Sequence, residues 1–283
     1  MGKKISFAEL KRLAEAQDAS AQNELGLRYE QGNGVAQSNR KAASWYKKAA
    51  KQGFAEAQNN LAVCYEQGKG VLRSAKKAFF CYRSAAEQGY AAALVNLGDC
   101  YSHGIGTAKD ASAAFECYRK AAGAGLAEGE YRLAGCFREG KGVSADPVRA
   151  LSLYKSAAEK GLSRAQYFYG VCFAEGEGTP KNDAEAVKWY RKAAEQGLAQ
   201  AQVELAICCQ RGQGTAKNAQ EGVKWLKKAA VQSDAEAQFR LGVCYYNGAG
   251  VGQNLSEALR WMRLAVQNGS GDAKQMLKKL GYA

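Results

Sequence analysis

"ELGLRYEQGNGV", residues 24–35, joins an apolar helical segment to a Gly-x-Gly turn. Taken alone, such a glycine-rich turn resembles a loop that binds phosphate. The same pattern returns six more times at intervals of 36 residues, with its glycines at Gly32/Gly34, Gly68/Gly70, Gly104/Gly106, Gly140/Gly142, Gly176/Gly178, Gly212/Gly214 and Gly248/Gly250. A phosphate loop is used once in a domain. A turn repeated at a fixed period therefore indicates a bend between two helices.

The chain divides from residue 21 into repeats one to seven, with no insertion: 21–56, 57–92, 93–128, 129–164, 165–200, 201–236 and 237–272. The first half of a repeat has apolar residues four apart, such as Leu25 and Tyr29. The second half has them at helical spacing, as in Ala42, Tyr46 and Ala49, which predicts one buried helical face. One hairpin cannot bury such faces alone, so we expect stacked repeats to bury them jointly.

The sequence indicates where the second helices of the repeats end. Left-handed C-caps are predicted after the second helices, at Gly53, Gly89, Gly125, Gly161, Gly197 and Gly269, with Ser233 in the sixth repeat.

The two ends of the sequence match half repeats. Residues 1–20 match a second half, and Ser6-x-x-Glu9 predicts a capping box at its start. Residues 273–283 match a first half, with Lys278 in place of the small residue. We therefore predict an N-terminal capping helix (1–20), seven repeats (21–272) and a C-terminal capping helix (273–283).

The repeated pattern is Leu-Gly/Ala-x-x-Tyr-x-x-Gly-x-Gly-Val/Thr, followed by Lys-Ala-x-x-Trp-Tyr-x-Lys-Ala-Ala-x-x-Gly. It resembles the Sel-one-like repeats, which are close relatives of tetratricopeptide repeats, and the resemblance covers residues 21–272. It implies an all-α fold, a right-handed α/α superhelix or solenoid. It also implies a non-enzymatic protein-interaction scaffold or adaptor that needs no cofactor and has no small-molecule substrate.

In tetratricopeptide-like superhelices the first helices line the concave side, and by resemblance the third, seventh and tenth positions of each repeat face it. These positions are polar in the first repeats, for example Asn23, Glu30, Asn59 and Glu66. From repeat four onward they become mostly apolar and aromatic. We predict a groove for a partner protein segment in repeats three to seven, with Tyr131, Arg138, Tyr167, Val171, Ile207, Phe239, Val243 and Tyr246 as binding residues. The alternative, partial burial inside a tightly wound superhelix, stays open.

Forty Lys and Arg against 27 Asp and Glu give a net charge of +13, which favours acidic partners or anionic surfaces. A basic ladder recurs after the tyrosine of each second helix: Lys47, Lys48, Arg83, Arg119, Lys120, Lys155, Arg191, Lys192, Lys227, Lys228 and Arg263. We favour a solvated convex face. The alternative function is a basic peripheral module that binds an anionic membrane or nucleic acid there. The neighbouring aromatic residues belong to the apolar stripe, which argues against base stacking and so against nucleic acid.

The residues that could carry chemistry are few. The single histidine, His103, and the absence of CxxC exclude a histidine-rich metal site and disfavour a zinc ribbon. Six of nine cysteines share one register: Cys64, Cys100, Cys136, Cys172, Cys208 and Cys244. Antiparallel helices could pair Cys64 with Cys81 and Cys100 with Cys117. We favour reduced thiols that fill space opposite large residues, and the oxidised alternative stays open.

The four tryptophans share one second-helix register, which indicates core packing rather than a ligand cage: Trp45, Trp189, Trp225 and Trp261. No apolar run reaches about 18 residues and no secretory signal is visible, so we expect a cytoplasmic protein. Met1-Gly2-x-x-x-Ser6 matches a myristoylation signal beside two lysines, although Ser6 is already explained as a helix cap.

Overall fold

The computed structural model describes residues 5–282, and within that range it contains 16 α-helices and no strand. This confirms the predicted all-α chain of helix–turn–helix repeats. The chain divides after Ala145 into two compact units, which we call the N-terminal unit (described from residue 5 to 145) and the C-terminal unit (146 to 282). Each is described by itself.

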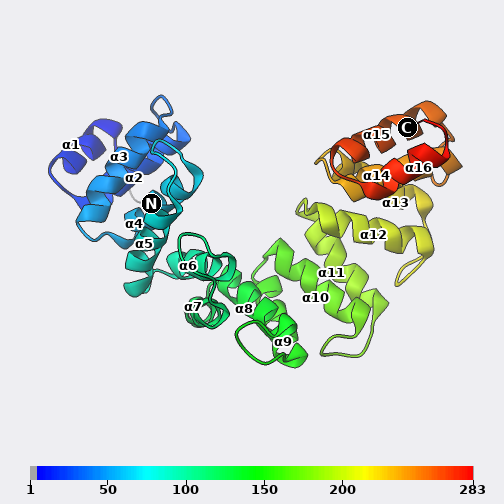
Figure 1. Ribbon diagram of the computed structural model, residues 1–283, viewed down its shortest axis with the longest axis horizontal. Helices are drawn as coiled ribbons and strands as arrows, with labels where there is room; N and C mark the ends of the chain where they lie inside the picture. Colours follow the sequence, from blue (N-terminus) through cyan, green and yellow to red (C-terminus); the bar gives the residue numbers. More distant parts are fainter. Residues whose placement is uncertain (1–4, 283) are drawn as a thin grey trace. The chain divides into compact units, whose positions relative to one another are not determined.

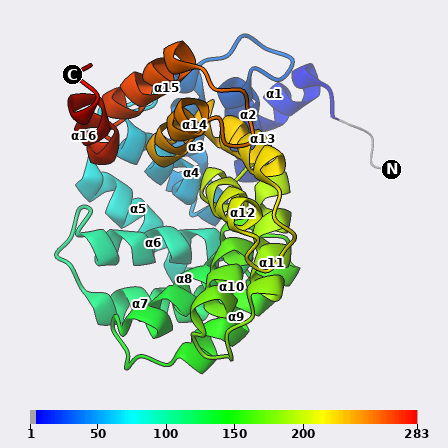
Figure 2. The same cartoon turned by 90° about the vertical axis from the view of Figure 1, so that its right-hand side faces the viewer.

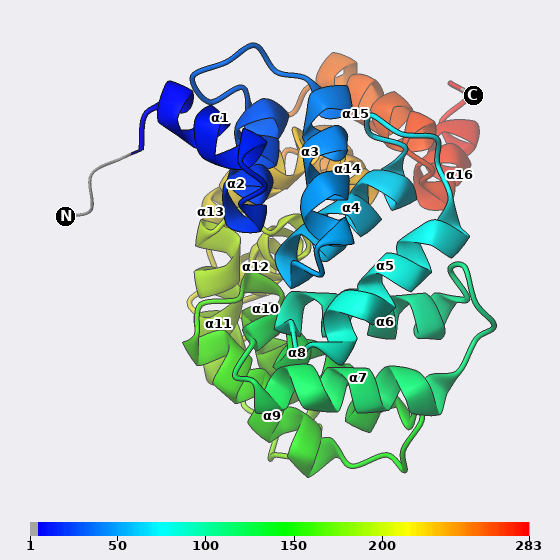
Figure 3. The same cartoon turned by 90° about the vertical axis from the view of Figure 1, so that its left-hand side faces the viewer.

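The N-terminal unit contains eight helices (Figures 1 and 3): α1 (Phe7–Glu15), α2 (Ala19–Gln31), α3 (Asn39–Lys51), α4 (Ala55–Gln67), α5 (Ala75–Glu87), α6 (Ala91–His103), α7 (Ala111–Gly123) and α8 (Ala127–Glu139). The C-terminal unit contains the other eight (Figure 2): α9 (Pro147–Glu159), α10 (Ser163–Glu175), α11 (Asp183–Glu195), α12 (Ala199–Arg211), α13 (Ala219–Ala230), α14 (Ala235–Asn247), α15 (Leu255–Gln267) and α16 (Gly271–Lys279). Within each unit, consecutive helices pack against one another.

Side-chain caps fix where most helices begin. The Ser6 hydroxyl accepts a hydrogen bond from the Glu9 amide at 3.2 Å, which confirms the predicted cap. The Glu9 carboxylate accepts a hydrogen bond from the Arg12 side chain at 2.8 Å rather than from the Ser6 amide, so only half of the predicted capping box forms. The second helices of the repeats are capped in the same way by Ser38, Ser74, Asp110, Asp146, Asn182, Asn218 and Asn254.

The Gly-x-Gly stretch is the bend between the two helices of a repeat, as predicted. Its first glycine, for example Gly68 with a φ of 72°, ends the first helix in the left-handed region. Its second glycine also has a positive φ, and at Gly70 a Cβ would lie 2.1 Å from the Asn39 carbonyl oxygen of the preceding repeat. At Gly34, in the first repeat, a Cβ would meet nothing within 4 Å. The second glycine therefore lets each turn lie against the repeat before it. Positive φ values also confirm the left-handed positions predicted after the second helices, Ser233 included.

A relay of amide side chains joins the repeats. The Gln52 side chain donates to the Gln22 side chain at 2.8 Å, and Gln22 donates to the Ala14 carbonyl of the preceding helix at 2.9 Å. The carbonyl lies near a helix end, where no intrahelical partner is available. The same side-chain pair recurs in four further repeats, as Gln88/Gln58, Gln196/Gln166, Gln232/Gln202 and Asn268/Gln238. The relay links each of these hairpins to its predecessor.

Candidate functional site

Six of the eight predicted binding residues lie in the C-terminal unit. Tyr167 and Val171 stand on α10, Ile207 on α12, and Phe239, Val243 and Tyr246 on α14. All six are half-buried except Val171, which is 8% exposed. Tyr131 and Arg138 are half-buried on α8, in the N-terminal unit. The structure thus places the apolar positions on successive first helices, among which α12 and α14 are in contact (Figure 2).

The predicted strip borders a cavity at α14. The cavity has a volume of about 600 Å³ and is lined by Gln210, Lys217, Ala219, Phe239, Arg240, Val243, Cys244 and Ala249. Phe239 and Val243 supply apolar surface and Lys217 brings positive charge, while Arg240 is paired with Glu236 of the same helix. The Gln210 amide donates to Cys244 Sγ at 3.1 Å, which fixes one wall. Such a hollow suits an apolar side chain carried by a segment with acidic neighbours.

The remaining strip residues also have packing roles. The Tyr167 ring lies 5.7 Å from the ring of Tyr190, and Ile207 packs against the same core cluster. Tyr246 packs with Phe239 and Val243 against the cluster that holds Met262 and Leu277. Each of these side chains is therefore partly exposed and partly used to hold the fold, and its role in binding stays a prediction.

The tenth positions of the first two repeats, Glu30 and Glu66, serve the core of the N-terminal unit. The hydroxyl of Tyr46 donates to Glu30 at 2.6 Å and that of Tyr82 donates to Glu66 at 2.7 Å. Burial, and next the bond to Glu30, raise the pKa of Tyr46. Glu30 and Glu66, which the resemblance places facing the concave side, are thus held by hydrogen bonds within their own repeats. The polar character of the early repeats comes in part from these carboxylates, which satisfy buried hydroxyls, and in part from Asn23 and Asn59, which accept hydrogen bonds from Asn60 and Asn96.

Much of the basic ladder has partners within the chain. Lys48, Lys192 and Lys228 lie 3.7, 3.8 and 3.9 Å from the ring centres of the tryptophans three positions before them. Arginines of the ladder pair with carboxylates, as in Arg83–Glu87, Arg119–Glu116 and Arg191–Glu221. These contacts fit the interpretation of a solvated outer face and leave fewer cations for an anionic surface.

The cysteines and the histidine show no reactive arrangement in the described chain. All nine cysteines fall inside the described range and are free thiols, eight buried and Cys81 half-buried. Burial raises the pKa of Cys64 and Cys117 to about 11, which disfavours their thiolates. His103 is exposed at the end of α6 with Nδ1 2.9 Å from the Asp99 carbonyl oxygen. Within residues 5–282, no group of three or more His, Cys, Asp or Glu is placed to hold a metal ion.

The tryptophans pack on the core, as expected: Trp189 and Trp225 are buried, and Trp45 and Trp261 lie against core clusters. Across the described chain, every helix is too short or too polar to cross a bilayer. Gly2 and its neighbouring lysines lie outside the described residues, and so does the proposed myristoylation signal apart from Ser6.

Comparisons with known proteins agree with this architecture. The model of the Sel1 repeat family matches residues 19–54, 55–90, 91–126, 127–162, 163–198, 199–234 and 235–270. The structure of a protective antigen of uropathogenic Escherichia coli with an SLR fold is 33% identical, with a TM-score of 0.80, over 98% of this chain and 59% of that one. This chain therefore spans less than two thirds of the length of that antigen.

Two further solved structures are similar. A Sel1 repeat protein from Oxalobacter formigenes is 31% identical, with a TM-score of 0.77, over 96% of this chain and 79% of that one. An immunity protein from Pseudomonas aeruginosa shares the fold at 21% identity and a TM-score of 0.54, over 77% of this chain and 82% of that one. None of the curated proteins matches the sequence.

Proposed function

Because the chain belongs to the Sel1 repeat family, whose solenoids are generally protein-interaction scaffolds, we propose that it is a non-enzymatic adaptor. It binds a segment of a partner protein on the surface formed by α10, α12 and α14. Phe239, Val243 and Tyr246 form the centre of this surface, with Tyr167, Val171 and Ile207 beside them. Tyr131 and Arg138 on α8 make a separate contact within the N-terminal unit.

The cavity at α14 carries this proposal. It is the place where predicted groove residues border a hollow large enough for a bulky side chain, about 600 Å³. Its apolar floor favours a hydrophobic anchor, and Lys217 favours a carboxylate beside that anchor. The ladder on the second helices is less suited to binding, because so many of its cations already have partners.

The test uses site-specific photocrosslinking in the native cell. A photoreactive phenylalanine at position 239 should capture a partner, whereas the same group at Lys224, an exposed position of α13, should not. Binding of the captured partner should then fall at least about tenfold in Val243→Lys, which places a charge in the floor, and stay unchanged in Lys224→Ala. Equal capture from both positions, or full binding by a folded Val243→Lys protein, would refute the proposed surface.

A further inference from the structure

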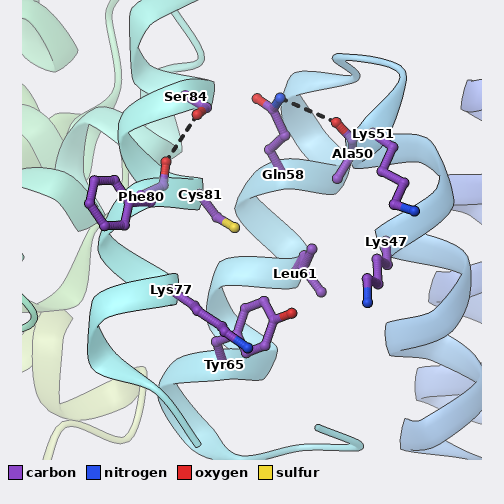
Figure 4. Close-up of a pocket in the computed structure, with 10 residues that line it drawn as sticks. All are labelled: Lys47, Ala50, Lys51, Gln58, Leu61, Tyr65, Lys77, Phe80, Cys81 and Ser84. Atoms are coloured by element: carbon purple, nitrogen blue, oxygen red, sulfur yellow. Dashed lines mark hydrogen bonds between the residues drawn. The ribbon is translucent and has the colours of Figure 1, made fainter. Parts of the chain in front are cut away.

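A second hollow, of about 350 Å³, lies on the N-terminal unit among α3, α4 and α5 (Figure 4). We call it the α3–α5 notch. It is lined by Lys47, Ala50, Lys51, Gln58, Leu61, Tyr65, Lys77, Phe80, Cys81 and Ser84. Figure 4 shows Leu61 and Tyr65 of α4 between the lysines of α3 on one side and Cys81 of α5 on the other. The notch uses none of the residues of the proposed α10–α14 surface and does not depend on it.

The internal repeat supplies a filled version of the same notch. The equivalent helices 144 residues later are α11, α12 and α13, and there Trp225 stands at the position of Cys81 and Lys228 at that of Ser84. Trp225 is 8% exposed, and Lys228 Nζ lies 3.9 Å from its ring centre. Trp225 and the lysine that covers its ring, both on α13, thus fill the α11–α13 notch. Cysteine and serine leave that volume open in the α3–α5 notch.

The charges of the two notches differ as well. In the α11–α13 notch, Arg191 Nη1 and Glu221 Oε1 pair at 2.8 Å across neighbouring repeats, and Trp225 Nε1 donates to Glu221 at 3.5 Å. The equivalent positions in the α3–α5 notch are Lys47 and Lys77. Lys51 likewise replaces Glu195, and none of the ten lining residues is acidic. The α3–α5 notch therefore lacks the counter-charge that its counterpart carries.

Phe80 extends the apolar surface of the notch outward. Its side chain is 42% exposed. The same register holds a polar residue in every other repeat: Ser44, Glu116, Ser152, Lys188, Lys224 and Arg260. A large exposed aromatic residue beside an apolar hollow indicates a contact larger than one small molecule.

We propose that the α3–α5 notch binds an acidic segment of a partner protein by taking up one of its aromatic side chains. The ring occupies the volume that Trp225 fills in the α11–α13 notch, between Leu61 and Cys81. Carboxylates on both sides of that ring pair with Lys47, Lys51 and Lys77, as Glu221 pairs with Arg191. Phe80 packs against the apolar part of the segment next to the ring. Charge complementarity selects an acidic segment over a basic one.

Isothermal titration of the full chain with a designed probe tests the proposal. The probe is an acetylated, amidated pentapeptide in which two glutamates stand on each side of a tryptophan. It should bind in saturable fashion, and added salt should weaken the binding. Cys81→Trp, which fills the notch from within, should weaken binding at least about tenfold. Lys77→Glu should weaken it several-fold, while Lys224→Glu, the same charge change on exposed α13, should leave it unchanged.

A second measurement reads the notch directly and does not rely on Cys81→Trp folding. Cys81 is the one half-buried cysteine among the nine, so saturating probe should slow its alkylation without protecting the others. Full binding by Lys77→Glu, equal binding of a probe with lysines in place of glutamates, or unprotected Cys81 would overturn the proposal. So would protection of Cys81 by vesicles of phosphatidylglycerol but not by the peptide, since this would identify a membrane contact instead.

Discussion

The α3–α5 and α11–α13 notches share a floor and differ in what closes it. Both have alanine, glutamine and leucine at three equivalent positions: Ala50/Ala194, Gln58/Gln202 and Leu61/Leu205. In the later notch a tryptophan and an ion pair complete the packing, whereas in the earlier one cysteine and lysines leave a cationic hollow. One backbone design thus gives a closed structural contact in one place and an open surface in another. The repeated positions hold the fold, and the varied ones decide whether a notch is filled or open.

The sharpest way to test this comparison is to open the filled notch. Trp225→Cys should destabilise the protein by about 3 kcal/mol, because it removes a buried aromatic side chain that its neighbours cannot replace. Denaturant unfolding measures the loss, and hydrogen exchange of the α13 amides reports it locally. Cys81→Ala is the matched change in the open notch and should cost less than about 1 kcal/mol. Equal losses at the two positions would mean that the two notches do not differ in packing.

Reversing the charge of Glu221 should have a smaller effect. Glu221→Lys removes the ion pair with Arg191 and sets two cations side by side, as in the α3–α5 notch. Both partners are about a third exposed, at 31% and 37%, so solvent screening limits the expected loss to about 1 kcal/mol. Glu195→Lys, at an exposed position of the same helix face as Arg191, is the control and should be near neutral. The midpoint of urea unfolding distinguishes the two variants.

The same ion pair predicts a difference in pH dependence. The hydrogen bond from Arg191 lowers the pKa of Glu221. A carboxylate with a lowered folded-state pKa stabilises the fold above its ordinary pKa of about 4.3, and this contribution is lost as the pH falls through the lowered value. Wild type should therefore lose about half a kcal/mol more stability than Glu221→Gln between neutral pH and pH ~3. Parallel stability curves for the two proteins would contradict this.

The smallest effect is expected from giving the open notch an ion pair. Lys77→Glu places a carboxylate opposite Lys47, as Glu221 lies opposite Arg191. Because both groups stand at an exposed rim, the gain should be about 0.3 kcal/mol. Lys76→Glu, next to it on α5 and also exposed, controls for the change in net charge. A loss of stability in Lys77→Glu alone would show that the two notches do not share the same geometry.

The sequence was sufficient for the architecture because its signals are local and repeated. The Gly-x-Gly bend and the Ser6 cap each depend on residues a few positions apart, the 36-residue period repeats the bend along the chain, and the structure confirms all three. The second glycine of the bend is different. Its role at Gly70 depends on the Asn39 carbonyl in the preceding repeat, which no local pattern contains.

The surfaces were harder to predict because they depend on side chains from several helices. The repeat register places Glu30 on the concave side, but it does not reveal that Glu30 accepts a hydrogen bond from Tyr46, 16 residues away on the next helix. The sequence predicts that Cys81 is a space-filling thiol opposite a large residue, but in the structure it faces a hollow. That hollow becomes visible only when α3 of the preceding repeat is set beside α4 and α5. The absence of tryptophan at residue 81 was the available signal, together with lysine at 77.

The amide relay has a consequence for how such a chain can change in length. In each amide pair, one side chain donates a hydrogen bond to a backbone carbonyl of the preceding repeat. A copied module of 36 residues would therefore carry its own hydrogen bond to the module before it, and it could be inserted without shifting the repeat register. The cationic notch does not copy in this way. A duplicate of the second module would keep a cysteine at the position of Cys81, but its predecessor would then offer Arg83 and Glu87, which pair with each other, in place of Lys47 and Lys51. Multiplying this notch requires duplication of two adjacent modules together.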